Sequence, residues 1–269
     1  MKDWKLAMNS VTVKQCQLLD SINVVSKTGY DGFGFWTKDL RQFESEGGKI
    51  DHVKNGLREG GLDACELLAV RKWQELPLND FDAALNEAKN VFEYATSIGA
   101  PIVTSPAGKT PHNREEWLNR LKEICQVSSS YDITIAIEFI AGRSIPDLSS
   151  ALDLVRSART EKVGVLLDFF HYHKSRSSME ELSSCSANEI ALVHVDDVAD
   201  KPLDDLKDKD RCFPGDGILP LNDLFNSLRD IGYSGYFSIE IFNDEYWQMD
   251  PMDVARIAYQ KTKPFLQNE

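Results

Sequence analysis

Four side chains that bind metals well stand at the ends of four successive apolar segments in the second half of the chain. They are Glu138 after ITIAI, Asp168 after VGVLL, His194 after IALV and Glu240 after YFSI. A carboxylate at the end of a buried run is costly unless pairing or coordination compensates its desolvation. One such acid could cap a helix or form a salt bridge, but four in succession indicate a shared site. Three carboxylates and one imidazole suit one divalent ion, which could be Mn²⁺, Mg²⁺, Co²⁺ or Zn²⁺.

More polar residues lie near the same segment ends. Asp168 begins the run DFFHYH, in which His171 could face the pocket and His173 could lie behind it or at the surface. The remaining histidines, His52 and His112, fall in helical or loop segments. We expect those two to be structural or exposed.

The segment DRCFPGDG, residues 210–217, follows the seventh apolar segment. Pro214, Gly215 and Gly217 predict tight turns in it. We expect Arg211 to reach from this loop over the metal and to bind a substrate oxygen. The alternative is a surface arginine that pairs with one of the many acids.

These residues need a scaffold that brings strand ends together. Apolar, β-rich segments alternate with helical patterns along the chain, and several are nearly continuous apolar runs, as in parallel strands buried on both faces. The predicted strands are residues 5–10, 30–36, 63–70, 101–106, 133–139, 163–169, 190–195 and 236–242. Such an alternation predicts an α/β fold, a single (β/α)₈ barrel domain over residues 1–269, whose working residues stand at the C-terminal strand ends.

Two of the intervening helices are well marked. Apolar residues recur at helical spacing over 79–99 and 221–233. Asn79 or Asp80 is placed to cap the first helix, and Gly99 to end it. A doubly wound open sheet would instead require a glycine-rich phosphate loop after an early strand, and the sequence has none.

Composition limits the partners. The chain has 30 Lys and Arg against 43 Asp and Glu, a net charge of −13, which argues against nucleic acid, although such a surface also simply maintains solubility. The five cysteines are scattered without a C-x-x-C pair, which is typical of a reducing compartment. Neither a signal peptide nor a membrane-spanning apolar stretch is apparent. We therefore expect a cytoplasmic protein with no membrane partner; a homo-oligomer remains open.

The C-terminal half carries a family resemblance. The motifs IAIEF, VGVLLDFFHYH, VHVDD, DRCFPGDG and SIEIFNDEYW resemble, in order and spacing, the sugar isomerase/epimerase superfamily with a xylose-isomerase-like barrel. Within it the chain is most similar to the inosose (2-keto-myo-inositol) isomerases of inositol catabolism. The resemblance implies the metal ligands Glu138, Asp168, His194 and Glu240, the catalytic residues Glu138 and Glu240, and the substrate-binding residues His171 and Arg211.

One departure from that family lies in the second strand. Relatives often carry a glutamate at its end, whereas YDGFGFW offers only Gly32, Phe33, Gly34, Phe35 and Trp36 there. Because this strand lines the pocket opposite the metal, the exact substrate stays open. Trp36 and Trp247 could supply an apolar wall of the pocket, or could pack in the core or at the rim.

The implied chemistry suits an α-hydroxy ketone. A metal that binds the carbonyl and hydroxyl oxygens acidifies the C–H bond between them and stabilises the enediolate. A carboxylate must remove that proton, and a group must return it. If the proton returns to the neighbouring carbon, the ketone moves along the carbon skeleton. If it returns to the same carbon from the opposite face, that stereocentre is inverted. The sequence leaves both open. The expected partner is a small polyhydroxy ketone, an inosose or a ketose.

Three other functions compete with this hypothesis. A lyase resembling the metal-dependent 3-dehydroshikimate dehydratases would use the same proton abstraction and then lose water. Endonucleases that act at apurinic DNA sites share the fold but need histidines for two more zinc ions. The segments ELLAV and PIVTSP have none, and Cys212 stands where such a histidine is needed. A non-catalytic sugar-binding protein would not need four ligands together.

Overall fold

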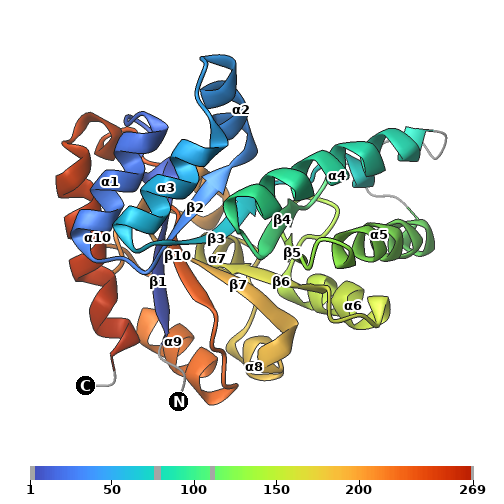
Figure 1. The fold of residues 1–269 in the computed structure, drawn as a ribbon. Coiled ribbons are helices and arrows are strands. Elements are labelled where there is room, and N and C mark those ends of the chain that lie inside the picture. Colours follow the sequence, from blue (N-terminus) through green and yellow to red (C-terminus); the bar gives the residue numbers. More distant parts are fainter. Residues whose placement is uncertain (1–3, 76–79, 110–112, 268–269) are drawn as a thin grey trace.

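Eight parallel strands form a closed barrel at the centre of the molecule (Figure 1). The computed structural model describes residues 4–75, 80–109 and 113–267. The strands follow one another around the barrel in sequence order, and the first closes it by pairing with both the second and the last. They are β1 (Lys5–Asn9), β2 (Gly32–Trp36), β3 (Asp63–Leu68), β4 (Ile102–Pro106), β5 (Thr134–Glu138), β6 (Val163–Asp168), β7 (Ile190–Val195) and β10 (Tyr236–Ile239). The predicted (β/α)₈ barrel is confirmed.

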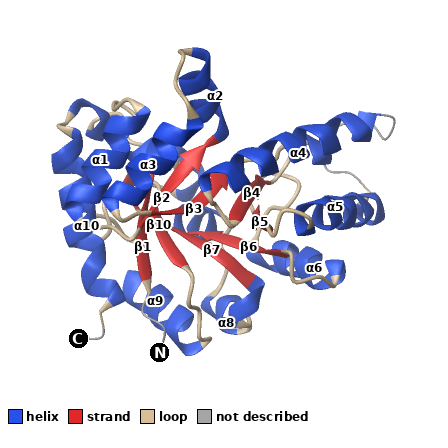
Figure 2. Ribbon diagram, in the orientation of Figure 1, coloured by secondary structure: helices blue, strands red, loops and turns tan. Residues whose placement is uncertain are grey.

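Helices surround the strands on the outside (Figure 2), except the short α7 (Phe169–Lys174), which directly follows β6 and lies behind the strands at the centre of the view in Figure 1. They are α1 (Leu18–Thr28), α2 (Thr37–Ser45), α3 (Ile50–Gly60), α4 (Phe81–Ile98), α5 (Arg114–Ser129), α6 (Leu148–Ala158), α7 (Phe169–Lys174), α8 (Met179–Ser183), α9 (Leu221–Asp230) and α10 (Pro251–Leu266). Among the described residues, none of these helices combines the length and the apolar character needed to cross a bilayer.

The two helices that the sequence marked most clearly are α4 and α9. Gly99 ends α4 with a left-handed φ of 81°, as predicted. Asp80 occupies the N-cap position of α4 but its side chain makes no capping hydrogen bond; Asn79 lies outside the described residues. Helix α9 buries Leu224 and Leu228 from the predicted apolar face.

The barrel wall separates two apolar layers. Most of the buried apolar residues belong to one large core, which includes alternate strand residues such as Ile135, Val165 and Val193. A second, small cluster is formed by the residues between them, Ala136, Leu166 and Leu192. Successive side chains of a strand point to opposite faces, so the small cluster lies inside the barrel. Two positions further along the same strands, on the same inner face, stand Glu138, Asp168 and His194.

Two short strands lie beyond the barrel. Segments β8 (Asp197–Val198) and β9 (Arg211–Cys212) pair in antiparallel fashion after β7. Several 3₁₀ helices follow strand ends, among them η1 (Ser10–Val13) after β1. These elements cover the C-terminal ends of the strands and position the side chains described next.

Candidate metal centre

The four side chains expected to bind a metal converge at the C-terminal end of the barrel. One potential ligand atom from each lies within 4.8 Å of the others. All are buried, with exposed fractions of 9% for Glu138, 2% for Glu240 and zero for Asp168 and His194. Strand register explains the convergence, because Asp168 of β6 pairs directly with His194 of β7. The next strand pairs Ser238 with His194, and Glu240 follows two residues later.

The His194 ring is held between acids on both sides. Its Nδ1 lies 3.1 Å from Glu240 Oε2 and 3.8 Å from Asp168 Oδ2. Its Nε2 lies 2.8 Å from Glu66 Oε2. The Nδ1 edge therefore faces the other potential ligands, and the Nε2 edge faces away from them toward β3.

Glu66 is a site residue that sequence reasoning missed. It is fully buried in β3, and its Oε1 accepts hydrogen bonds from Ser238 Oγ at 2.6 Å and Asn9 Nδ2 at 3.2 Å. It also explains one glycine of the second strand. A Cβ atom on Gly34 would lie 2.4 Å from Glu66 Oε1, so this carboxylate fills the space that a side chain at Gly34 would need. Its signal in the sequence was a lone acid within the apolar segment ACELLAV.

Arg211 lies inside the cluster. Its side chain is 1% exposed, so the surface alternative is wrong. Its Nη1 donates to Asp168 Oδ2 at 2.7 Å and to Asp196 Oδ2, and lies 3.9 Å from Glu240 Oε2. The guanidinium also lies over the ring of Phe170. Whether Arg211 binds a substrate oxygen stays a prediction, but the structure gives it a second task as the counter-ion of buried acids.

The loop that carries Arg211 is fastened by Asp197. Its Oδ2 accepts the backbone N–H groups of Gly215 and Gly217, each at 3.0 Å, and its Oδ1 accepts that of Leu219 at 2.9 Å. Gly215 has a left-handed φ of 86°. A Cβ atom on Gly217 would lie 2.4 Å from Asp197 Oδ1, so the close approach requires glycine. The predicted turns are confirmed.

His171 reaches the same cluster from α7. Its side chain is buried, and its Nε2 lies 3.6 Å from Glu138 Oε1. Its backbone N–H donates to Asp168 Oδ1, which caps the helix. His173, two residues further along α7, is half-buried, and His52 is exposed as expected. His112 lies outside the described residues.

Negative charge is in excess at this site. The buried carboxylates are Glu66, Glu138, Asp168, Asp196 and Glu240. Burial, together with Glu240 and Asp168, raises the pKa of Glu138 to about 8. Burial would also raise the pKa of Asp168, but Arg211 and the two histidines outweigh it and hold that pKa well below its usual range. Burial raises the pKa of Asp196 well above its usual value in spite of Arg211. The carboxylates therefore favour additional positive charge among them.

Several polar atoms around the cluster also lack partners. Within the described residues, the buried atoms without a hydrogen-bond partner here are Glu240 Oε1, Asp196 Oδ1, His171 Nδ1 and Arg211 Nε. Orphaned buried polar atoms are costly in a native protein. Such atoms, together with the excess of carboxylates, fit a site built to hold a divalent cation and a polar ligand.

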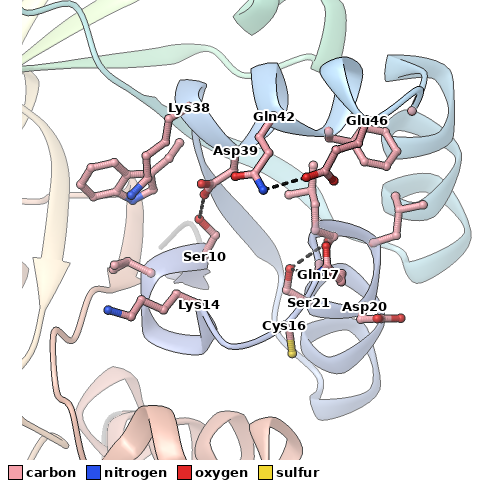
Figure 3. A pocket seen from close by; sticks show the side chains of 16 residues that line it. Ser10, Lys14, Cys16, Gln17, Asp20, Ser21, Lys38, Asp39, Gln42 and Glu46 are labelled. Carbon is pink, nitrogen blue, oxygen red and sulfur yellow. Dashed lines mark hydrogen bonds between the residues drawn. The ribbon is translucent and has the colours of Figure 1, made fainter.

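A cavity lies between η1, α1 and α2, and none of the four clustered residues is among those that line it. It has a volume of about 530 Å³ and is lined by residues of η1, α1 and α2, with Lys14 and Lys38 on one side (Figure 3). Trp36 borders it, and its Nε1 donates to Asn9 Oδ1 at 2.8 Å. Both Trp36 and Trp247 are half-buried and pack edge-on against Phe242. The two tryptophans thus belong to the rim around the strand ends.

Comparison with known proteins agrees with this geometry. The family model described as xylose isomerase-like TIM barrel matches residues 22–264. The chain belongs to that family. The predicted family is therefore confirmed, and the closed barrel of this chain is the architecture that the family description names.

The relatives of this xylose isomerase-like barrel include enzymes with different named activities. The chain is 25% identical over 267 residues to the inosose isomerase of Halalkalibacterium halodurans, and the match covers 96% of this chain and 95% of that protein. It is 23% identical over 235 residues to the 3-dehydroshikimate dehydratase of Pseudomonas aeruginosa, covering 85% of this chain and 37% of that protein. The crystal structure of IolI protein with a bound zinc atom has a TM-score of 0.91 at 24% identity and covers 97% of this chain and 98% of its own.

Proposed function

We propose that the protein is a divalent-metal-dependent isomerase or epimerase of a small polyhydroxy ketone, an inosose or a ketose. The observation that carries this proposal is the buried cluster of Glu138, Asp168, His194 and Glu240 in a barrel of this family. The inosose isomerases to which the chain is similar over nearly its whole length support the cyclitol as substrate.

The four clustered residues would hold one ion, with Zn²⁺, Mn²⁺, Co²⁺ and Mg²⁺ as candidates. A similar barrel crystallised with zinc makes Zn²⁺ the first ion to test. When bound, such an ion would polarise the carbonyl and neighbouring hydroxyl oxygens of the substrate and stabilise the negative charge of an enediolate.

Proton transfer falls to the two glutamates. Glu240 Oε2 faces His194, whereas Glu240 Oε1 is buried without a hydrogen-bond partner in the described structure and could accept a substrate proton. Glu138 is the other glutamate of the cluster, and it would share the transfer of the proton to and from the substrate. His171, beside Glu138 Oε1, would orient this carboxyl or bind a substrate hydroxyl. Arg211 would fix the orientation of Asp168 and, through its unpartnered Nε, bind a substrate oxygen.

A dehydratase is the second candidate. It is favoured by the similarity to 3-dehydroshikimate dehydratases, because loss of water can follow the same proton abstraction. The chain spans little more than a third of those proteins, which makes this the weaker candidate.

Turnover by the purified protein tests both candidates. We would incubate it with each divalent ion and with inososes, ketoses or 3-dehydroshikimate, and follow products by NMR. Interconversion of inososes or ketoses supports the proposal. Dehydration of 3-dehydroshikimate alone supports the second candidate, and no turnover of any of these compounds contradicts both.

Deuterium incorporation distinguishes proton transfer from hydride shift. If a carboxylate removes a proton to form an enediolate, turnover in D₂O should place deuterium on the carbon next to the product carbonyl. Mass spectrometry of the product measures this. A base shielded from solvent can return part of the original hydrogen, so incorporation below one atom agrees with the mechanism. Complete retention of the original hydrogen would indicate hydride transfer.

A further inference from the structure

We propose that Glu66 is the positioning residue of the metal centre: it holds Nε2–H of His194 so that Nδ1 keeps its lone pair toward the other ligands. This inference deepens the proposed function and rests on the proposed metal site. The two edges of the His194 ring carry the argument. Nε2 lies 2.8 Å from Glu66 Oε2, and Nδ1 lies 3.1 Å from Glu240 Oε2.

A neutral imidazole has one protonated and one unprotonated nitrogen, and the partner of each nitrogen decides which tautomer is present. A carboxylate can only accept a hydrogen bond, so Glu66 favours the proton on Nε2. Glu240 Oε2 faces Nδ1 in the same way, but Glu240 belongs to the metal cluster and would itself be bound to the ion, which leaves Nδ1 to coordinate and Glu66 to accept the ring's proton. Carboxylates that hold the second nitrogen of a metal-binding histidine typically raise metal affinity by 10- to 100-fold.

Glu66 is itself held rigidly. Its Oε1 accepts from Ser238 Oγ and Asn9 Nδ2, so that Oε2 alone is directed at His194. Glu66, Ser238, Asn9 and His194 are all fully buried. Asn9 also accepts a hydrogen bond from Trp36 at the rim. Such a chain of satisfied groups fixes the carboxylate in one orientation before any ligand binds.

The neighbouring strand leaves space for this carboxylate. The three atoms nearest to a Cβ built on Gly34 all belong to Glu66: Oε1 at 2.4 Å, Cγ at 2.9 Å and Cδ at 3.0 Å. Residue 34 must therefore be glycine while residue 66 is glutamate. The same geometry means that a carboxylate placed on residue 34 would occupy the space of the Glu66 carboxylate once Glu66 is removed.

The main test is Glu66→Gln, which retains the shape of the side chain. A glutamine amide can donate to Nε2 and so favours the wrong tautomer, with the proton on Nδ1. We expect the affinity for Zn²⁺, measured by competition with a chromophoric chelator, to fall about 10- to 100-fold. In the ¹⁵N spectra of the histidine-labelled, metal-free proteins, the wild-type His194 ring should carry a proton on Nε2, whereas the ring in Glu66→Gln should carry its proton on Nδ1. The signal is assigned by its loss in His194→Gln.

Asp63→Asn is the matched control. Asp63 lies at the opposite end of the same strand, where it binds Lys5 and Tyr236 at the surface, and its replacement should leave Zn²⁺ affinity unchanged. A reciprocal pair keeps the test decisive if Glu66→Gln folds poorly. Glu66→Ala should lose affinity, and adding Gly34→Asp or Gly34→Glu to it should restore part of the loss. Gly34→Asp alone should be overcrowded and melt at a lower temperature.

The outcomes separate this inference from the proposed function. A folded Glu66→Gln protein that binds Zn²⁺ as tightly as the wild type overturns the positioning role. A weakened variant whose His194 ring, without metal, still carries a proton on Nε2 overturns it as well, because the tautomer was then not lost. A failure of the reciprocal pair to regain any affinity also counts against it. A wild-type protein that binds none of the four candidate ions contradicts the proposed metal site itself.

Discussion

The Asp168→Ala protein is expected to lose its bound divalent ion and to turn over substrate roughly a thousand-fold more slowly than the wild type. The size follows from a metal's contribution of several kcal/mol to transition-state stabilisation, at about 1.4 kcal/mol for each factor of ten. Elemental analysis should find about one ion per wild-type chain and almost none in this variant. His194→Ala should behave in the same way.

The control for ligand loss is an exposed acid. Asp153→Ala breaks a surface pair with Arg114 and should leave metal content and kinetics unchanged. Circular dichroism must show that the ligand variants still fold, because metal binding and folding are coupled. Two or three tightly held ions in the wild type would instead favour a nuclease or a two-metal hydride-shift isomerase.

Arg211→Ala is expected to destabilise the protein strongly and also to lower its catalytic efficiency. Removing one partner of a buried ion pair costs about 3–5 kcal/mol, because the remaining charges stay uncompensated. In a chain of this size that lowers the melting temperature by roughly 6–20 °C. Asp168 and Asp196 are the carboxylates left without their counter-ion. The catalytic efficiency kcat/KM should fall at least about ten- to a hundred-fold through the lost charge-assisted hydrogen bonds.

Thermal melting of the metal-free protein and steady-state kinetics measure these two effects. Arg256→Ala is the matched control, since Arg256 pairs with Asp253 at the surface and its loss should change the free energy of unfolding by less than about 0.5 kcal/mol. Arg211→Lys retains the charge but not the fork of donors, and should recover part of the stability. An Arg211→Ala protein that melts like Arg256→Ala would mean that the buried acids do not depend on the guanidinium.

The barrel and the convergence of the four acid and imidazole side chains could be predicted because both follow from local patterns. Continuous apolar runs marked the strands, and an acid or imidazole at the end of such a run is too costly to bury alone. In a parallel barrel all those ends meet at one face, so the sequence order of Glu138, Asp168 and His194 was enough to bring them together.

Glu66 and the acid partners of Arg211 could not be placed in this way. Glu66 carries the same signal, an acid in an apolar strand, but its contact with His194 runs across the barrel interior. That contact depends on how the barrel closes and how its strands are staggered. The alternation of side chains along a single strand carries no information about either. The sequence indicated only a loop around Arg211. Its burial comes from the pairing of β9 with β8, which brings it beside Asp196.

The hydrogen bonds between Asp197 and the 210–219 loop affect how the enzyme binds its substrate. Three backbone N–H groups of the loop converge on this one buried carboxylate, and Gly217 allows the close approach. Arg211 is therefore ordered once, when the chain folds. A loop that had to close over each substrate would lose conformational entropy in every catalytic cycle. Substrate binding should accordingly resemble the docking of two rigid surfaces. Substrate specificity should be easiest to change at positions on the rim of the barrel where the backbone makes no hydrogen bonds to residues of the reacting centre.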